Sequence, residues 1–140
     1  MFLGKPIKTL EKMLSVARRA RKRIAKERNW VQGKLAVTAK GIECPPRSRK
    51  ATAFCAVGSL HASTGDERIV RAIENLMLDV VDDSYYDDKE VSELRVLNYF
   101  NDDHASHRAV LQVYDEAIER LESRLRWERK KQRGAGHAKA

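Results

Sequence analysis

Two groups of residues carry side chains suited to metal binding or catalysis. In Asp102-Asp103-His104-x-x-His107, two histidines lie about one helical turn apart beside two carboxylates, a ligand set that a divalent cation accepts. The segment lacks the HExxH spacing of zinc hydrolases, and acidic residues also stabilise a helix start, where the backbone dipole is positive. We therefore interpret it as the start of a helix and predict no metal site and no cofactor.

Cys55 is the second candidate, because a thiol near a helix N-terminus can have a lowered pKa and act as a nucleophile. The residues that would complete such a site are the bases His61, His104 and His107 and the orienting residues Asn101 and Asp102. Cys55 lies, however, within the apolar run 53–57, which is typical of a buried, unreactive thiol. We predict that the protein is not an enzyme and has no catalytic residues.

Lysine and arginine are concentrated at the two ends of the chain. Residues 1–50 carry 15 Lys and Arg against 3 Asp and Glu, residues 51–123 carry 6 against 16, and residues 124–140 carry 7 against 1. Basic clusters of this kind bind phosphates and release the counterions held around a nucleic acid. We expect the nucleic-acid contacts to come from Arg18, Arg19, Lys22, Arg23, Lys26, Arg47, Arg49, Lys50, Arg129, Lys130 and Lys131.

The first basic cluster falls on a predicted helix. Arg18, Lys22 and Lys26 follow one another at intervals of four, so they should stack on one face and repel each other unless phosphates or carboxylates lie nearby. Trp127, in the last cluster, offers a ring on which an unpaired base can stack. No helix-turn-helix, zinc-finger or RNA-binding sheet signature is present, so we predict a non-enzymatic module that contacts mainly the backbone of DNA or RNA.

The acidic middle of the chain supports an alternative function. Its most acidic segment contains Asp82, Asp83, Tyr85, Tyr86, Asp87 and Asp88. Negative charge there repels phosphate, so the two tyrosines are better suited to a protein contact than to nucleic acid. The alternative is a protein-interaction factor, either an inhibitor or a structural component, that docks through its acidic and basic surfaces or associates with itself.

Length and composition are compatible with one domain that has a real core. The chain has 140 residues, of which 42% are hydrophobic and 34% charged, and its net charge is +8. It contains no apolar run long enough to cross a bilayer and no secretory signal, and its two cysteines are too few for a disulfide framework. We expect a reduced, cytoplasmic protein with no membrane partner, and we identify no small-molecule substrate.

Apolar residues at intervals of three and four predict an all-α fold, a single compact domain of about five helices. We expect a long basic first helix over residues 6–28, an irregular loop over 29–50 in which 34–41 has strand character, and a helical core over 51–132. The core helices are expected at about 51–63, at 64–82 after a Thr64–Glu67 capping box, at 89–100, and from Asp103 or Ser106 to Lys131. Residues 133–140 are expected to form a flexible basic tail outside the folded domain, which spans 1–132.

A set of short motifs resembles those of a family of small uncharacterised bacterial and phage proteins, known as a domain of unknown function. The motifs are Trp30-x-Gln32-Gly33, Gly41, Cys55-x-x-Gly58-x-Leu60-x-Ala62, Asn101-Asp102 and Val110-Leu111. Phe100 stands where the family usually has Trp, and Ser59 where it has Ala. The similarity covers about residues 29–120, which makes the first helix and the tail additions. It implies a helical fold and a bacterial or mobile-element setting, and it implies no activity.

Overall fold

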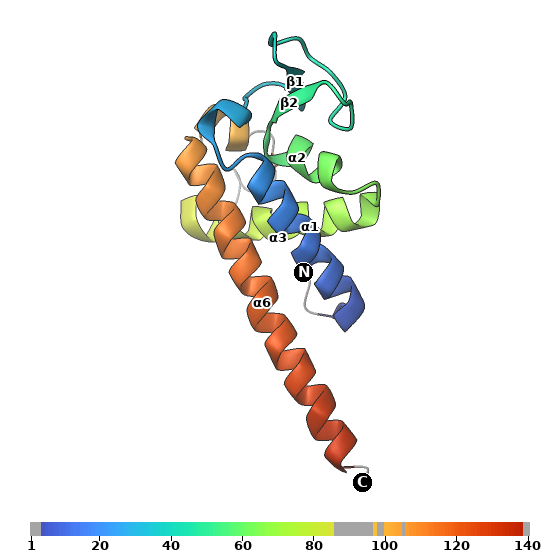
Figure 1. Ribbon diagram of the computed structural model, residues 1–140. Helices are drawn as coiled ribbons and strands as arrows, with labels where there is room; N and C mark the ends of the chain where they lie inside the picture. The colour runs from blue at the N-terminus through green and yellow to red at the C-terminus, as the bar shows by residue number, and fades with distance from the viewer. Residues whose placement is uncertain (1–3, 86–96, 98–99, 105, 139–140) are drawn as a thin grey trace.

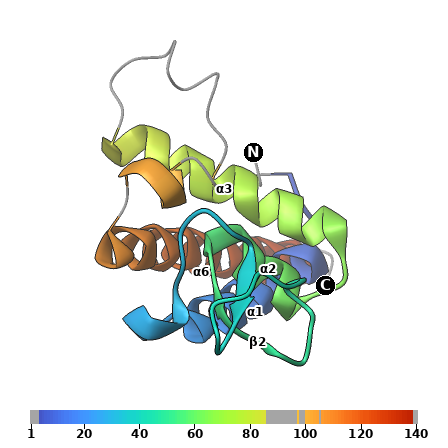
Figure 2. The ribbon, with the colours of Figure 1, turned by 90° about the horizontal axis from the view of Figure 1, so that it is seen from above.

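The computed structural model describes residues 4–85, 97, 100–104 and 106–138. Its elements in chain order are α1 (Ile7–Arg23), η1 (Glu27–Asn29), β1 (Ala36–Thr38), β2 (Ala51–Phe54), α2 (Ala56–Ser63), α3 (Glu67–Tyr85), η2 (Phe100–His104) and α6 (His107–Ala138). The described part is mostly helical, as predicted, with a small two-stranded sheet. α1 and α6 lie side by side and α3 crosses behind them, while the hairpin of β1 and β2 lies at one end (Figure 1, Figure 2).

α1 forms because its apolar residues recur on one face, which is buried against α2, α3 and α6. Pro6 precedes the helix, and its carbonyl oxygen accepts a hydrogen bond from Leu10 N at 3.0 Å. The helix ends at Arg23, so the predicted extension to residue 28 is wrong. Ile24 leaves the helical conformation and is fully buried, and the chain continues into the short turn η1.

Residues 51–54 form strand β2, which corrects the prediction of a helix over 51–63. β2 pairs antiparallel with β1, with Ala36 opposite Phe54 and Val37 opposite Ala53. The run Ala-Thr-Ala-Phe suits a helix or a strand equally, so the outcome is decided by a partner strand that pairs its backbone groups. That partner lies within 34–41, where strand character was predicted, and this prediction is confirmed.

α2 begins directly after β2, with Cys55 at its N-cap position. Gly58 lies so close to the start of the hairpin that an added Cβ would be 1.8 Å from the carbonyl oxygen of Leu35. The helix therefore packs on the backbone of the chain that leads into β1, which only glycine allows at this position.

α3 is capped by Asp66 and not by the predicted Thr64–Glu67 box. Asp66 Oδ1 accepts hydrogen bonds from the backbone N–H of Arg68 at 3.1 Å and of Ile69 at 3.4 Å, while Thr64 Oγ1 accepts one from Asp66 N at 3.1 Å. The helix runs to Tyr85, slightly beyond the predicted end. The residues predicted to face the core are all buried: Ile69, Val70, Ile73, Leu76, Met77, Val80 and Val81.

The predicted helix over 89–100 lies mostly outside the described residues. Of this segment the structure describes Leu97 and Phe100, and both are buried. Phe100–His104 form η2, a turn of π-helix. Ser106 Oγ then accepts a hydrogen bond from Ala109 N at 3.1 Å, so Ser106 is the N-cap predicted as one of two choices.

α6 continues to Ala138 and extends well beyond the helical body (Figure 1), so its predicted end near Lys131 is wrong, and residues 133–138 of the predicted tail are helical. Extending an existing helix is easier than nucleating one, and the alanines and basic residues of this segment are good helix formers, which outweighs Gly134 and Gly136.

Candidate nucleic-acid interface

Of the five nucleic-acid residues predicted on the first helix, three are exposed and hold no acidic partner among the described residues. Arg19 and Lys22 lie three positions apart on the outward side of α1, and Lys26 lies in the turn that follows. We call Arg19, Lys22 and Lys26 the open cations. Because α1 ends at Arg23, the predicted stacking of Lys26 on the turn of Arg18 and Lys22 is wrong.

On the side that faces α6, the cations of α1 are paired. Arg18 Nη2 lies 3.2 Å from Glu122 Oε2, and Arg21 Nε lies 2.9 Å from Asp115 Oδ1. These pairs are partly exposed, and pairs of this kind contribute at most about 1 kcal/mol to stability. They hold the two helices together without removing the arginines from the surface.

On the side that faces α2 and α3, the cations of α1 are also engaged. Lys12 Nζ lies 2.7 Å from Asp66 Oδ2, and this contact lowers the pKa of the Asp66 carboxyl. Arg23 Nε donates a hydrogen bond to Ser63 Oγ at 3.1 Å, and its guanidinium lies 5.8 Å from the centre of the Phe54 ring. Arg23 therefore already makes contacts within the protein, in contrast to the open cations.

The basic end of α6 meets the first half of α1. Arg129 Nη2 lies 3.1 Å from Glu11 Oε2, so residues 118 positions apart in the sequence are neighbours. A groove of about 370 Å³ runs between the two helices here, and Arg18, Arg19 and Arg129 line it together with Glu11. The fold therefore brings the first and last basic clusters to one place.

Farther along α6, Lys130 and Lys131 are exposed. Trp127 is 50% exposed, with the Arg124 guanidinium 4.3 Å and the Lys131 ammonium 5.0 Å from its ring centre. A base could stack on this ring only where these two cations leave its face open, so the cations are the more accessible feature of this segment.

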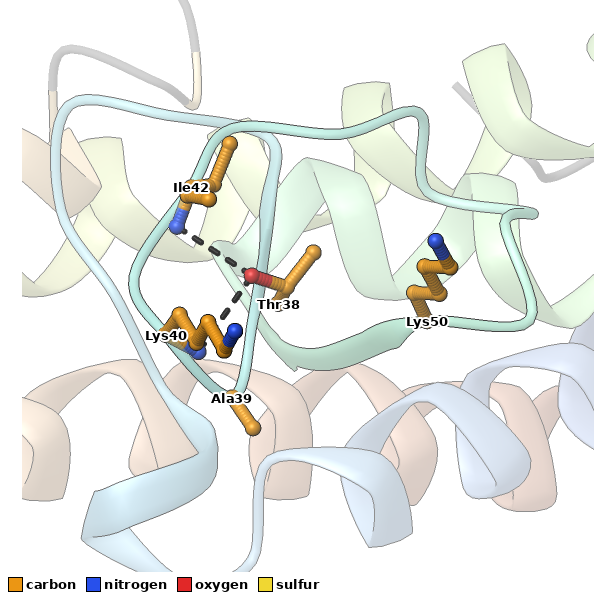
Figure 3. Close-up of a pocket in the computed structure, with 5 residues that line it drawn as sticks. All are labelled: Thr38, Ala39, Lys40, Ile42 and Lys50. Carbon is orange, nitrogen blue, oxygen red and sulfur yellow. Dashed lines mark hydrogen bonds between the residues drawn. The ribbon is translucent and has the colours of Figure 1, made fainter.

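The third basic cluster lies in the loop of the hairpin, where Arg47, Arg49 and Lys50 are exposed. An open hollow of about 600 Å³ lies in this loop. It is lined by Thr38, Ala39, Lys40, Ile42 and Lys50, which Figure 3 shows as sticks. Thr38 Oγ1 accepts hydrogen bonds from the backbone N–H of Lys40 and Ile42, both at 3.3 Å, which holds the turn in shape. Besides Lys50, which already belongs to this cluster, the hollow adds one lysine, Lys40, to the basic surface of the loop.

The acidic residues proposed for a protein contact are partly engaged inside the molecule. Asp83 Oδ2 lies 3.0 Å from Arg120 Nη2, and Asp82 is half-buried and also engaged. Tyr85 ends α3, while Tyr86, Asp87 and Asp88 lie outside the described residues. The described part of this segment therefore offers less free negative charge than its sequence suggests.

Three of the motifs that carried the family resemblance, those of Trp30, Cys55 and Asn101, meet at Asn101, which is fully buried. Its side-chain oxygen accepts hydrogen bonds from Trp30 Nε1 at 2.7 Å and Ala56 N at 3.0 Å, and its amide nitrogen donates to Val31 O at 3.1 Å. Asp102 Oδ1 accepts a hydrogen bond from Gly33 N at 2.8 Å. The cluster joins the loop after α1, the start of α2 and η2, so its evident role is structural.

Cys55 is 2% exposed, as expected for a buried thiol. Burial raises its pKa, the backbone N–H of Gly58 lowers it to a smaller extent, and the carboxylate of Asp102 raises it. The Sγ atom accepts the Gly58 N–H at 3.2 Å, so the thiol acts as the N-cap of α2. A protonated, buried thiol is a poor nucleophile.

Of the two histidines weighed as metal ligands, His107 is described in full. Its Nε2 donates to the carbonyl oxygen of Ile24 at 2.6 Å, and its ring centre lies 5.6 Å from that of Trp30. It thereby fixes the start of α6 against the end of α1. Within the ranges that the structure describes, no three His, Cys, Asp or Glu side chains are placed to hold a metal ion, and no helix is long and apolar enough to span a bilayer.

The acidic partners of the interface were not predicted, although the sequence holds a signal for them. Asp115, Glu122 and Arg129 follow one another at intervals of seven, which places them on one face of α6. Glu11 and Arg18 are also seven apart, and they meet Arg129 and Glu122 in the antiparallel pair of helices. These two charge series match once α1 and α6 are known to lie antiparallel.

The chain matches the model of a family of unknown function (DUF6197) over residues 9–120, and it belongs to that family. The expected membership in an uncharacterised family is confirmed. The match begins at residue 9, so α1 is part of the family's domain and not an addition as expected, while the end of α6 lies outside the match. Comparison with curated proteins and with solved structures finds no match.

Proposed function

We propose that this member of a family of unknown function is a non-enzymatic binding module, of bacterial or phage origin, that grips the phosphate backbone of nucleic acid. The observation that carries the proposal is the set of open cations, Arg19, Lys22 and Lys26, which are exposed and have no acidic partner among the described residues. Neighbouring like charges on a helix are unfavourable by a few tenths of a kcal/mol each, so a polyanion that binds there relieves a real cost.

The placement of the other cations supports the same function. The basic end of α6 lies against α1 through Arg129. The exposed residues next to it, Lys130 and Lys131, can therefore extend the contact with phosphates along a nucleic-acid strand. The hairpin loop contributes Arg47, Arg49 and Lys50. Contacts to backbone phosphates do not distinguish one base sequence from another. The affinity should therefore depend on charge and salt concentration and only weakly on the order of the bases.

The experiment compares two triple variants of equal charge in a nucleic-acid binding titration. Arg19→Ala/Lys22→Ala/Lys26→Ala removes the open cations, and Arg68→Ala/Arg71→Ala/Arg108→Ala removes three exposed arginines from α3 and the start of α6. The first variant should weaken binding at least tenfold more than the second. It should also lower the slope of log Kd against log salt by about one unit for each phosphate that the protein no longer neutralises.

Equal loss in the two variants would mean that only net charge matters, and the proposed surface would then be wrong. The alternative function, docking on a protein partner, predicts no nucleic-acid binding at moderate salt and a protein that co-purifies after nuclease treatment and a high-salt wash. Either result would replace the proposal.

A further inference from the structure

The groove between α1 and α6 contains three arginines that come from the two ends of the chain. Arg18 and Arg19 are consecutive in α1, and Arg129 reaches the groove from α6. The apolar side chains of Leu14 and Leu125 also line it, and its volume is about 370 Å³. Three arginines that line one groove can form a site for an anionic group.

Two of the three arginines already hold carboxylates. Glu11 pairs with Arg129 at 3.1 Å, with side-chain exposures of 49% and 46%. Glu122 pairs with Arg18 at 3.2 Å, with exposures of 38% and 55%. Arg19 has no acidic partner among the described residues. The arginines are therefore oriented toward oxyanions, and exposed pairs of this kind are weak enough to be exchanged.

We infer that this groove seats one backbone phosphate of a bound nucleic acid, and that Glu11 and Glu122 occupy the arginines until that phosphate displaces them. The inference rests on the proposed function. A backbone phosphodiester presents two non-bridging oxygens and one negative charge, as a carboxylate does, and guanidinium groups bind it in a bidentate manner. The neighbouring phosphates of the same strand and the counterions that binding releases favour it over the two glutamates.

This arrangement makes the acidic side chains competitors of the ligand. Removing the charge of Glu11 frees Arg129 without removing any cation that holds the phosphate. Loss of a negative charge elsewhere changes only the long-range field, which physiological salt screens within about 8 Å. A variant at Glu11 should therefore differ from a variant of equal charge at a remote position.

The first test measures the Kd for a labelled DNA of random sequence by fluorescence anisotropy in Glu11→Gln and Glu119→Gln. Glu119 is exposed on α6, outside the groove, and its side chain pairs with no other described residue. Glu11→Gln should tighten binding about two- to fivefold, the range expected from an exposed ion pair. Glu119→Gln should change the Kd by less than about 1.5-fold. Equal effects would overturn the inference.

The second test removes the cation. Arg129→Ala should weaken binding more than Arg126→Ala, which deletes an exposed arginine on the same helix outside the groove. In an Arg129→Ala background, Glu11→Gln should lose its effect, because the arginine that it releases is gone. A Glu11→Gln effect that persists in this background would contradict the phosphate seat.

The outcomes separate this inference from the proposed function. If the wild-type protein binds no nucleic acid, both are wrong. If it binds and the open cations matter, but Glu11 and Arg129 behave as their controls do, only the groove is wrong. Thermal unfolding of each variant, which should match the wild type because all substituted side chains are exposed, shows that folding is unchanged.

Discussion

Trp30 donates its indole N–H to the side-chain oxygen of Asn101 over 2.7 Å, and this bond joins segments 71 positions apart in the sequence. The same oxygen accepts Ala56 N at 3.0 Å, so one buried amide holds the loop after α1 and the start of α2 in place. The basic surface described above depends on this arrangement, since it positions the end of α1 relative to the hairpin.

Replacing Asn101 with Leu should therefore be strongly destabilising. The change leaves the buried Ala56 N–H, the partly buried Trp30 N–H and the Val31 carbonyl without their partner, and each unsatisfied buried group costs about 1–3 kcal/mol. We expect the free energy of unfolding in urea to fall by about 3–5 kcal/mol. Trp30→Phe, which removes a single donor, should cost less than Asn101→Leu. Similar stability of Asn101→Leu and the wild type would show that the cluster does not hold the fold.

Gly58→Ala should prevent normal folding, because the new Cβ would lie 1.8 Å from the backbone oxygen of Leu35 and backbone cannot move aside without opening the hairpin. The matched change is Gly134→Ala in α6, where nothing lies within 4 Å. That variant should be neutral or stabilised by up to about 1 kcal/mol, the difference in helix propensity. Circular dichroism and thermal unfolding distinguish the two, and a stable Gly58→Ala would disprove the close contact.

Tyr114 should make the protein less stable at alkaline pH. Its hydroxyl donates to Ala56 O at 2.7 Å inside the core, and burial raises its pKa above the ordinary value of 10.0. Above about pH 10 the unfolded chain loses this proton while the folded chain keeps it, so the free energy of unfolding falls as pH rises. In Tyr114→Phe this fall should be shallower. Equal alkaline slopes in the two proteins would contradict the raised pKa.

Cys55 should react slowly with iodoacetamide in the folded protein, because it is buried and its thiol stays protonated. Cys44, which is half-buried, should be labelled first. Mass spectrometry of the labelled peptides after short exposure measures both rates. Rapid labelling of Cys55 before unfolding would instead support the alternative, considered from the sequence, that Cys55 is a catalytic nucleophile.

Much of the helical core was predictable, because the apolar positions of α1, α3 and α6 repeat at helical intervals and one face of each is buried. Thr64 and Glu67 matched a capping box, yet Asp66 caps α3, since its carboxylate also binds Lys12 from α1. Residues 51–54 suited two secondary structures, and only pairing with 36–38 decides between them. Such tertiary choices are not encoded in a local pattern.

The sequence was enough to propose the basic residues of the candidate surface, but not to tell which of them pair with acidic residues. Eleven basic residues were proposed from clustering alone, and in the structure Arg18 and Arg129 pair with Glu122 and Glu11 while Arg23 binds Ser63. The open cations are distinguished from these by the positions of carboxylates on another helix. Which arginines these carboxylates reach depends on how α1 packs against α6, and the charge pattern of one segment does not give that packing.

The decisive measurement for the proposed function is the salt dependence of nucleic-acid binding by the nuclease-treated wild-type protein. Fluorescence anisotropy with labelled DNA and RNA of random sequence should show binding at about 50 mM salt that weakens steeply toward about 200 mM, with a linear plot of log Kd against log salt. Absence of binding at the lower concentration, or a Kd that does not change with salt, would contradict the proposed function.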